Sequence, residues 1–157
     1  MRYVRVEFNR GGTYSDPGAY LERLPSIAAA LPVGARAFAT DPEHYNFRGR
    51  RCIKDLKPQY LQPVAGGLEL QLKHNCWKHE EDLTIRYAGI QSVTLNPPND
   101  GDVARLYDVM LDEILPTDHG CTHEFTCLSG SLVIACEDLT ATWADSNCPE
   151  LGASPDH

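Results

Sequence analysis

Two short stretches of the chain each place a cysteine between two histidines, and these residue types bind zinc or act as nucleophile and base. The stretches are "LKHNCWKHEED" at residues 72–82 and "TDHGCTHEF" at residues 117–125. Zinc ligands usually come in pairs about two to five residues apart, whereas a single residue separates the members here. A zinc-binding domain or a metal-dependent hydrolase is therefore an alternative interpretation. Its ligands would be His74, Cys76, His119, Cys121 and His123.

A thiol nucleophile is the second possible chemistry, with Cys121 as the nucleophile and a neighbouring histidine as its base. Residues two apart on a strand share a face, but they are not placed for a nucleophile–base hydrogen bond, and no third residue orients the imidazole. The sequence also has no phosphate-binding glycine loop, no dinucleotide fingerprint and no His-Glu-x-x-His motif. We therefore predict that the chain is not an enzyme and has no catalytic residue or cofactor.

If residues 119–127 are extended, alternate side chains share one face: His119, Cys121, His123, Phe125 and Cys127. Phe125 and Cys127 are typical core residues, so this face is predicted to point inward. A histidine on a buried face must be paired or bound to a metal. We expect His123 to be hydrogen-bonded inside the sheet.

Charge is distributed unevenly along the chain. Residues 1–98 carry 13 Lys and Arg against 10 Asp and Glu, while residues 99–157 carry Arg105 against 12 acids. Such an acidic half repels nucleic acid and anionic lipid and attracts a basic protein partner. The alternative is that the acids pack beside the molecule's own Arg-rich stretch at residues 48–57. The predicted partner-binding residues are Asp108, Asp112, Glu113, Asp118 and Glu124, with Trp77 or Tyr107 as an aromatic anchor.

The stretch "YNFRGRRC" raises RNA binding as a further alternative. It places Tyr45 and Phe47 beside the arginines of residues 48–57, and RNA-binding surfaces combine aromatic and basic side chains. The formal net charge of −8 disfavours a nucleic acid partner, because phosphate contacts dominate such affinity.

The elements that must position these residues begin with a half-buried strand at residues 2–8, followed by a loop. Asp16 and Pro17 then predict the start of a helix over residues 17–31. Its apolar stripe would be Leu21, Leu24, Ile27 and Leu31, and Pro25 inside it predicts a kink or two abutting helices. Residues 35–39 are predicted to form a strand.

From residue 59 onward the pattern is that of an antiparallel meander. Gly66 and Gly67 predict a hairpin, strands follow through residue 95, and a second pair of strands meets at Ser129 and Gly130. Residues 102–115 fit either a helix or a strand, and we favour a short helix or turn followed by a strand at 107–115. The predicted class is α+β: a mostly antiparallel, meander- or sandwich-like sheet with one N-terminal helical segment. Residues 1–144 would form a single domain, with a frayed polar tail at 145–157.

No apolar run approaches the ~20 residues needed to cross a bilayer, and the first residues lack the apolar region of a signal peptide. The expected compartment is the cytoplasm, where the six cysteines should stay reduced.

Three segments resemble a group of small bacterial proteins: "RCIKDLKPQYLQPVAGGLELQL", "LTIRYAGIQSVTL" and "HEFTCLSGSLVIACEDLTATW". In that group a Cys/Leu-x-x-Asp turn leads into a β-meander, and a late His-Glu strand precedes the closing strand. Asp55 and His123 match its recurring polar positions, whereas Lys54 and the helix at 17–31 depart from it. The group includes immunity proteins of polymorphic toxin systems. The resemblance implies a cytoplasmic antitoxin, a toxin inhibitor that would cover a basic toxin enzyme with its acidic face.

Overall fold

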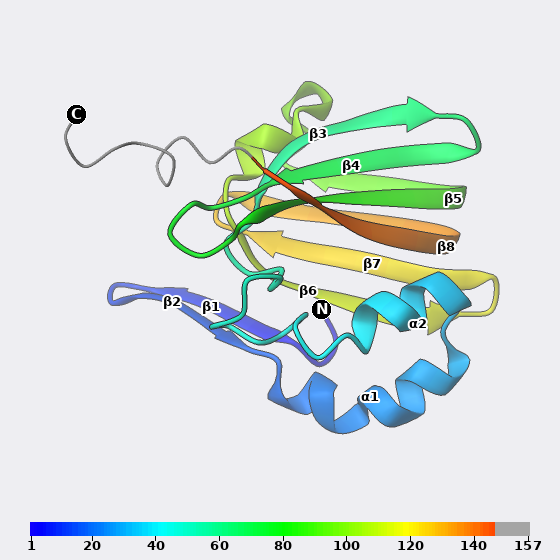
Figure 1. Ribbon diagram of the computed structural model, residues 1–157, viewed down its shortest axis with the longest axis horizontal. Coiled ribbons are helices and arrows are strands. Elements are labelled where there is room, and N and C mark those ends of the chain that lie inside the picture. The colour runs from blue at the N-terminus through cyan, green and yellow to red at the C-terminus, as the bar shows by residue number, and fades with distance from the viewer. Residues whose placement is uncertain (147–157) are drawn as a thin grey trace.

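The computed structural model describes residues 1–146, which form a mixed α+β fold with two antiparallel sheets (Figure 1). The strands are β1 Arg5–Asn9, β2 Gly12–Asp16, β3 Lys57–Val64, β4 Gly67–Lys73, β5 Glu81–Asn96, β6 Val109–Thr117, β7 Gly120–Cys127 and β8 Gly130–Asp145. The helices are α1 Gly18–Ala30 and α2 Val33–Ala39, with short 3-10 turns η1 Asn99–Gly101 and η2 Val103–Leu106. The predicted α+β class with a mostly antiparallel sheet is confirmed.

The larger sheet has the strand order β3-β4-β5-β8-β7-β6. It consists of two three-stranded meanders, joined where β5 pairs with β8 along almost their whole 16-residue lengths. The first half of β5 pairs also with β4, and the first half of β8 pairs also with β7. A bulge between Ile90 and Ser92 interrupts the β5–β8 register between these two halves, and bulges bend strands.

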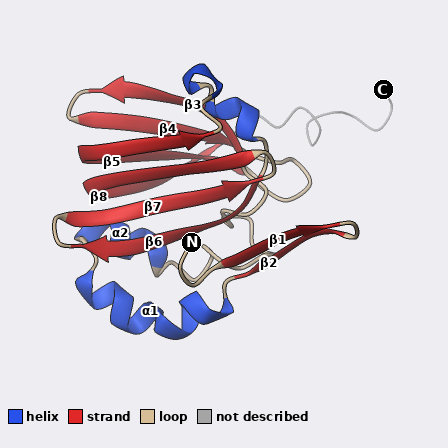
Figure 2. Cartoon of the chain, turned by 180° about the vertical axis from the view of Figure 1, so that it is seen from behind, coloured by secondary structure: helices blue, strands red, loops and turns tan. Residues whose placement is uncertain are grey.

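The two edges of this sheet meet at one end. The N–H of Asp55 donates to the carbonyl of Val109, and the N–H of Val109 donates to the carbonyl of Leu56, both at 2.8 Å. The start of β3 is therefore bonded to the start of β6, and the sheet curls round the core. Figure 2 shows the same sheet from behind, with α1 and α2 beside β6.

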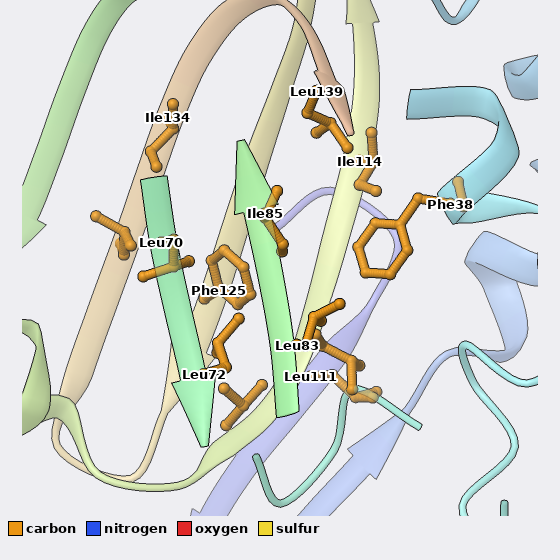
Figure 3. Close-up of a cluster of buried hydrophobic side chains, with 14 of the residues drawn as sticks. Phe38, Leu70, Leu72, Leu83, Ile85, Leu111, Ile114, Phe125, Ile134 and Leu139 are labelled. Atoms are coloured by element: carbon orange, nitrogen blue, oxygen red, sulfur yellow. The ribbon is translucent and has the colours of Figure 1, made fainter. Parts of the chain in front are cut away.

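Apolar side chains from both meanders and from α2 fill the inside of the curled sheet (Figure 3). Among these buried side chains, Figure 3 labels Phe38, Leu70, Leu72, Leu83, Ile85, Leu111, Ile114, Phe125, Ile134 and Leu139. Each such side chain contributes about 1.5–3 kcal/mol when it leaves water. β7 alternates strictly between half-buried and buried residues, so its predicted inward face is confirmed, apart from His119, which is exposed in the preceding turn.

Several N-terminal predictions are wrong. Residues 35–39 lie in α2 rather than in a strand, because short Ala-rich segments favour helix and Asp138 accepts hydrogen bonds from the first N–H groups, those of Gly34 and Ala35. The loop expected after the first strand forms β2. In α1 the fully buried side chain is Tyr20, whose hydroxyl donates to the carbonyl of Ile114 at 2.7 Å, whereas Leu21 is exposed.

α1 continues through Pro25 as a single helix. The preference for a short helix followed by a strand in residues 102–115 is confirmed by η2 and β6. Among residues 1–146, no helix combines the length and the apolar character needed to cross a membrane. β8 extends to Asp145, and the remainder of the expected frayed tail, residues 147–157, lies outside the described part of the chain.

Candidate functional site

Asp112 in β6 is the centre of a fully buried polar network. Its carboxylate lies 2.7 Å from Nε2 of His44 and 2.7 Å from Nε2 of His123, and none of the three side chains is exposed. His44 comes from the loop after α2 and His123 from β7. Three segments distant in the sequence therefore meet at one carboxylate.

The partners of each imidazole determine where its protons lie. Nδ1 of His44 is 2.9 Å from the carbonyl oxygen of Phe38, so both nitrogens of His44 face acceptors and both must donate. This makes His44 an imidazolium paired with the Asp112 carboxylate. His123 instead has Nδ1 at 2.8 Å from the hydroxyl of Tyr87, which can donate to it.

Burial changes the pKa values of His123, Tyr87 and Asp112, and it does so in different directions. It lowers the pKa of His123, and the hydrogen bond to Asp112 only partly opposes this, so the ring is neutral with its proton on Nε2. Burial raises the pKa of Tyr87 well above its ordinary value, which keeps the hydroxyl protonated. Burial alone would raise the pKa of Asp112, but the charge of His44 and the hydrogen bonds from both imidazoles hold it well below the ordinary range.

The network has the acid and base groups of a catalytic relay but no access to a substrate. Phe38 packs its ring 4.3 Å from that of His44, and it separates the network from a surface pocket of about 400 Å³ between α2 and β8. The hydroxyl of Tyr45 donates to the carbonyl of Asp112 and closes the remaining side. The network therefore fastens the loop of residues 40–56 to the sheet.

Glu113, the next residue of β6, is buried on the opposite face. Its carboxylate accepts the backbone N–H groups of Arg2, Tyr3 and Val4 at 2.7–2.8 Å. The prediction that Asp112 and Glu113 are exposed partner contacts is therefore wrong. The reason is that β6 is covered on both faces, by the core on one and by residues 1–4 on the other.

A second feature is accessible to solvent. Four exposed apolar side chains come from four separate loops at the end of the molecule where the sheet edges meet: Phe47, Trp77, Tyr107 and Leu128. We call this the loop-end surface. Trp77 is 70% exposed and Tyr107 is 59% exposed, values that are unusual for such large side chains.

Hydrogen bonds and an ion cluster hold these loops together. The N–H of Leu128 donates to the carbonyl of Asp108 at 3.0 Å, which ties the β7–β8 turn to the residue after Tyr107. Asp55 accepts hydrogen bonds from Lys54 at 3.1 Å and from Lys78 at 3.3 Å.

The ammonium groups of Lys54 and Lys78 also contact aromatic rings of the loop-end surface. Their ammonium nitrogens lie about 6 Å from the ring centre of Phe47, and that of Lys78 lies 5.7 Å from the ring centre of Trp77. These are cation–π contacts. The rings of Phe47 and Trp77 are therefore linked through Lys78.

The backbone of this end is strained at Tyr107, which follows η2 and precedes β6. Tyr107 has φ 60° and ψ −154°, a conformation that is almost exclusive to glycine and costs about 1–3 kcal/mol. Asp55 also has a positive φ, of 76°. Such strain persists only where the surroundings enforce it, and it is concentrated at functional sites.

The structure brings together three of the seven predicted partner-binding residues: Trp77, Tyr107 and Asp108. Burial raises the pKa of Asp108, against the nearby charge of Lys57. Asp118 follows the last residue of β6 and so lies roughly 30 Å from Asp108, at ~3.3 Å per strand residue. Glu124 lies in the middle of β7 and accepts a hydrogen bond from the amino group of Met1 at 3.1 Å. The predicted carboxylates do not form one acidic face.

The five predicted metal ligands are not brought together either, and no group of three or more His, Cys, Asp or Glu within residues 1–146 could hold a metal ion. His74 is paired with Asp82 at 2.6 Å, and Cys121 lies against Cys136. Cys76 is disulfide-bonded, so the expectation that all six cysteines stay reduced is wrong.

The arginines behind the RNA-binding alternative are largely engaged within the molecule. Arg50 bonds Glu80 at 3.1 Å, and Arg51 makes two hydrogen bonds to Glu81. Arg50 and Arg51 therefore pair with glutamates of the β4–β5 region, while Lys57 of the same stretch lies near Asp108 of the acidic half.

The sequence reasoning missed His44 and Tyr87 in the buried network and Leu128 in the loop-end surface, and it named Phe47 only for the RNA-binding alternative. His44 lies in "DPEHYNF", where the pattern indicates only a turn, and its partner is 68 residues away. Comparisons with known proteins found no matching family model, and no curated protein or solved structure matches the chain.

Proposed function

We propose that this chain is a binding protein of the immunity type, which inhibits a partner enzyme by docking the loop-end surface onto it. The observation that carries the proposal is that Phe47, Trp77, Tyr107 and Leu128 are exposed on four loops that hydrogen bonds and cation–π contacts tie together. Aromatic side chains of this kind supply most of the energy of protein–protein interfaces. Large exposed apolar patches on a stable scaffold mark such interfaces.

The partner we propose is a folded protein of net positive charge. The whole chain carries a formal net charge of −8, and an opposite net charge on the partner accelerates encounter. The loop-end surface itself is nearly balanced, since Lys54, Lys57 and Lys78 face Asp55 and Asp108. Long-range charge would therefore govern the association rate, and the aromatic side chains would govern the dissociation rate.

Catalysis is a weaker proposal for this chain. Its buried acid–base network lies behind Phe38, and the exposed loop-end surface has anchoring side chains without an adjacent nucleophile–base pair. An inhibitor needs only a rigid surface that fills or covers the partner's active site.

The test begins with affinity capture on the immobilised chain, in parallel with its Trp77→Ala and Tyr107→Ala variants. A basic protein retained by the parent chain is then purified, and its binding and enzyme inhibition are measured directly. Truncating a central aromatic anchor should raise Kd at least about 30-fold, equivalent to ~2 kcal/mol. The association rate should fall steeply with added salt.

Val33→Ala is the matched control, because Val33 is 77% exposed but lies at the start of α2, outside the loop-end surface. It should bind as the parent chain does. Equal binding by Trp77→Ala, Tyr107→Ala and Val33→Ala would overturn the proposed surface, and an acidic or absent partner would overturn the proposed function.

A further inference from the structure

Cys121 and Cys136 form a thiol pair that the proposed function does not use. They are direct partners in the β7–β8 register, and their Sγ atoms lie 3.7 Å apart. Both are free thiols with no exposed surface. Two cysteines in such contact can exchange a hydrogen bond, and they can also be joined covalently.

The backbone geometry already suits a disulfide. Directly opposed residues of antiparallel strands have Cα atoms about 4.5 or 5.5 Å apart, depending on the hydrogen-bonding position. Disulfides occur at Cα separations of about 4.4–6.8 Å. Either position is inside this window, so bond formation requires side-chain rotation and a small strand adjustment rather than a rearrangement.

The surroundings allow that adjustment. On the far side of β8, Cys136 pairs with Ile90 beside the bulge in β5, where the ladder is locally interrupted. Gly120, with a positive φ of 143°, immediately precedes Cys121 at the start of β7. The ladder is therefore interrupted beside Cys136, while Cys121 lies one residue after the turn at the start of β7.

The two thiols of the pair are shifted in opposite directions. The hydrogen bond between them raises the pKa of Cys121 and lowers that of Cys136, where burial acts in the opposite direction. Burial raises the pKa of Cys52 to about 11 and that of Cys127 to about 12. Thiolates rather than thiols react with oxidants, so Cys136 is favoured as the attacking group.

We propose that Cys121 and Cys136 are a modification site at which hydrogen peroxide introduces a reversible disulfide between β7 and β8. The Cys136 thiolate attacks one peroxide oxygen, the O–O bond breaks, and a sulfenic acid forms with release of hydroxide. Cys121 then attacks the sulfenic sulfur, the S–O bond breaks, and the second hydroxide leaves. The protons of the two thiols convert both hydroxides to water. The two sulfurs lose two electrons together, and the peroxide gains them.

The test treats the folded chain with hydrogen peroxide, blocks the remaining thiols after unfolding, and maps the peptides without reduction. Cleavage after glutamate is the suitable digest, because Arg105 is the last lysine or arginine in the sequence. It separates residues 114–124, which contain Cys121, from residues 125–137, which contain Cys127 and Cys136. The expected product is a linked pair of these peptides, lighter than their sum by two hydrogens, which dithiothreitol separates.

Cys127→Ala is the matched control, since it removes the other cysteine of the second peptide while leaving the pair intact. It should form the link to the same extent as the parent chain, and Cys136→Ala should abolish it. If Cys136→Ala does not fold, the peptide map of Cys127→Ala still tests the link, because Cys136 is then the only cysteine in the second peptide. Thiols that remain unmodified, or thiols converted to sulfinic acid without the link, would overturn the proposal. A link that is lost in Cys127→Ala would do the same.

Discussion

His44 and Asp112 are 68 residues apart in the sequence, yet their side chains form a 2.7 Å charge-assisted hydrogen bond with no exposure to solvent. A buried charge is tolerated only when it is paired and its other hydrogen-bonding positions are satisfied. His123 and the carbonyl of Phe38 satisfy those positions here. The pair therefore links the order of the loop at residues 40–56 to the folding of β6.

Replacing Asp112 with Asn should lower the free energy of unfolding by about 3 kcal/mol, because it leaves the His44 cation buried without its counter-charge. Urea denaturation measures this change. Asp118→Asn is the control, since Asp118 is exposed and its replacement should alter stability by less than about 0.5 kcal/mol. Equal effects of the two variants would contradict the buried ion pair.

Stability should decline as the pH falls below 6.5, the ordinary pKa of histidine. Burial lowers the pKa of both His79 and His123 in the folded protein. At these two histidines the unfolded chain binds protons that the folded chain does not, so their contribution to stability is complete above pH 6.5 and is lost progressively below it. A second decline should begin below pH 3.8, the ordinary value for Asp, because the pKa of Asp112 is held lower in the fold.

The histidine part of this decline is checked with His79→Gln, followed by denaturation at a series of pH values. Glutamine can still donate to the carbonyl of Cys52, which His79 contacts through Nε2 at 2.9 Å. The slope between about pH 5 and 6.5 should become shallower. His119→Gln, in an exposed turn, should leave the slope unchanged, and a slope unchanged in both variants would refute the assignment.

Tyr107→Gly should stabilise the fold by about 1 kcal/mol, because glycine relieves backbone strain of roughly 1–3 kcal/mol and loses part of that gain to its greater unfolded-state entropy. Tyr107→Ala keeps the strain and should give no such gain. Thermal unfolding of the two variants compares them directly. Under the proposed function both should weaken partner binding, so the glycine variant would separate stability from function. Equal destabilisation by glycine and alanine would argue against strain at this residue.

Gly34→Ala should destabilise the protein by about 1–3 kcal/mol, the usual cost of overpacking. A Cβ at this position would lie 1.9 Å from the backbone carbonyl oxygen of Leu139, so α2 would have to move away from β8. Gly11→Ala is the control, because its nearest contact would be a flexible side-chain atom at 3.4 Å. Chemical denaturation gives both values, and a neutral Gly34→Ala would mean that α2 is not packed closely on β8.

Local patterns predicted the parts of the fold that depend on neighbouring residues. The hairpin at Gly66 and the inward face of β7 follow from turn chemistry and period-2 alternation. The same reasoning failed for residues 35–39, where five residues are too few to distinguish a strand from the helix that Asp138 caps from 103 residues away. It also misplaced Asp112 and Glu113, since alternation assumes that one face of a strand meets water.

The sequence by itself determined a mostly antiparallel α+β fold, because side-chain alternation and turn residues act over a few positions. Only the tertiary structure decided which carboxylates are buried, which thiols meet and which loops share one end. These outcomes depend on the closure between Leu56 and Val109 and on contacts across tens of residues. No local pattern specifies such contacts, because the residue types that form them are equally compatible with exposure to solvent.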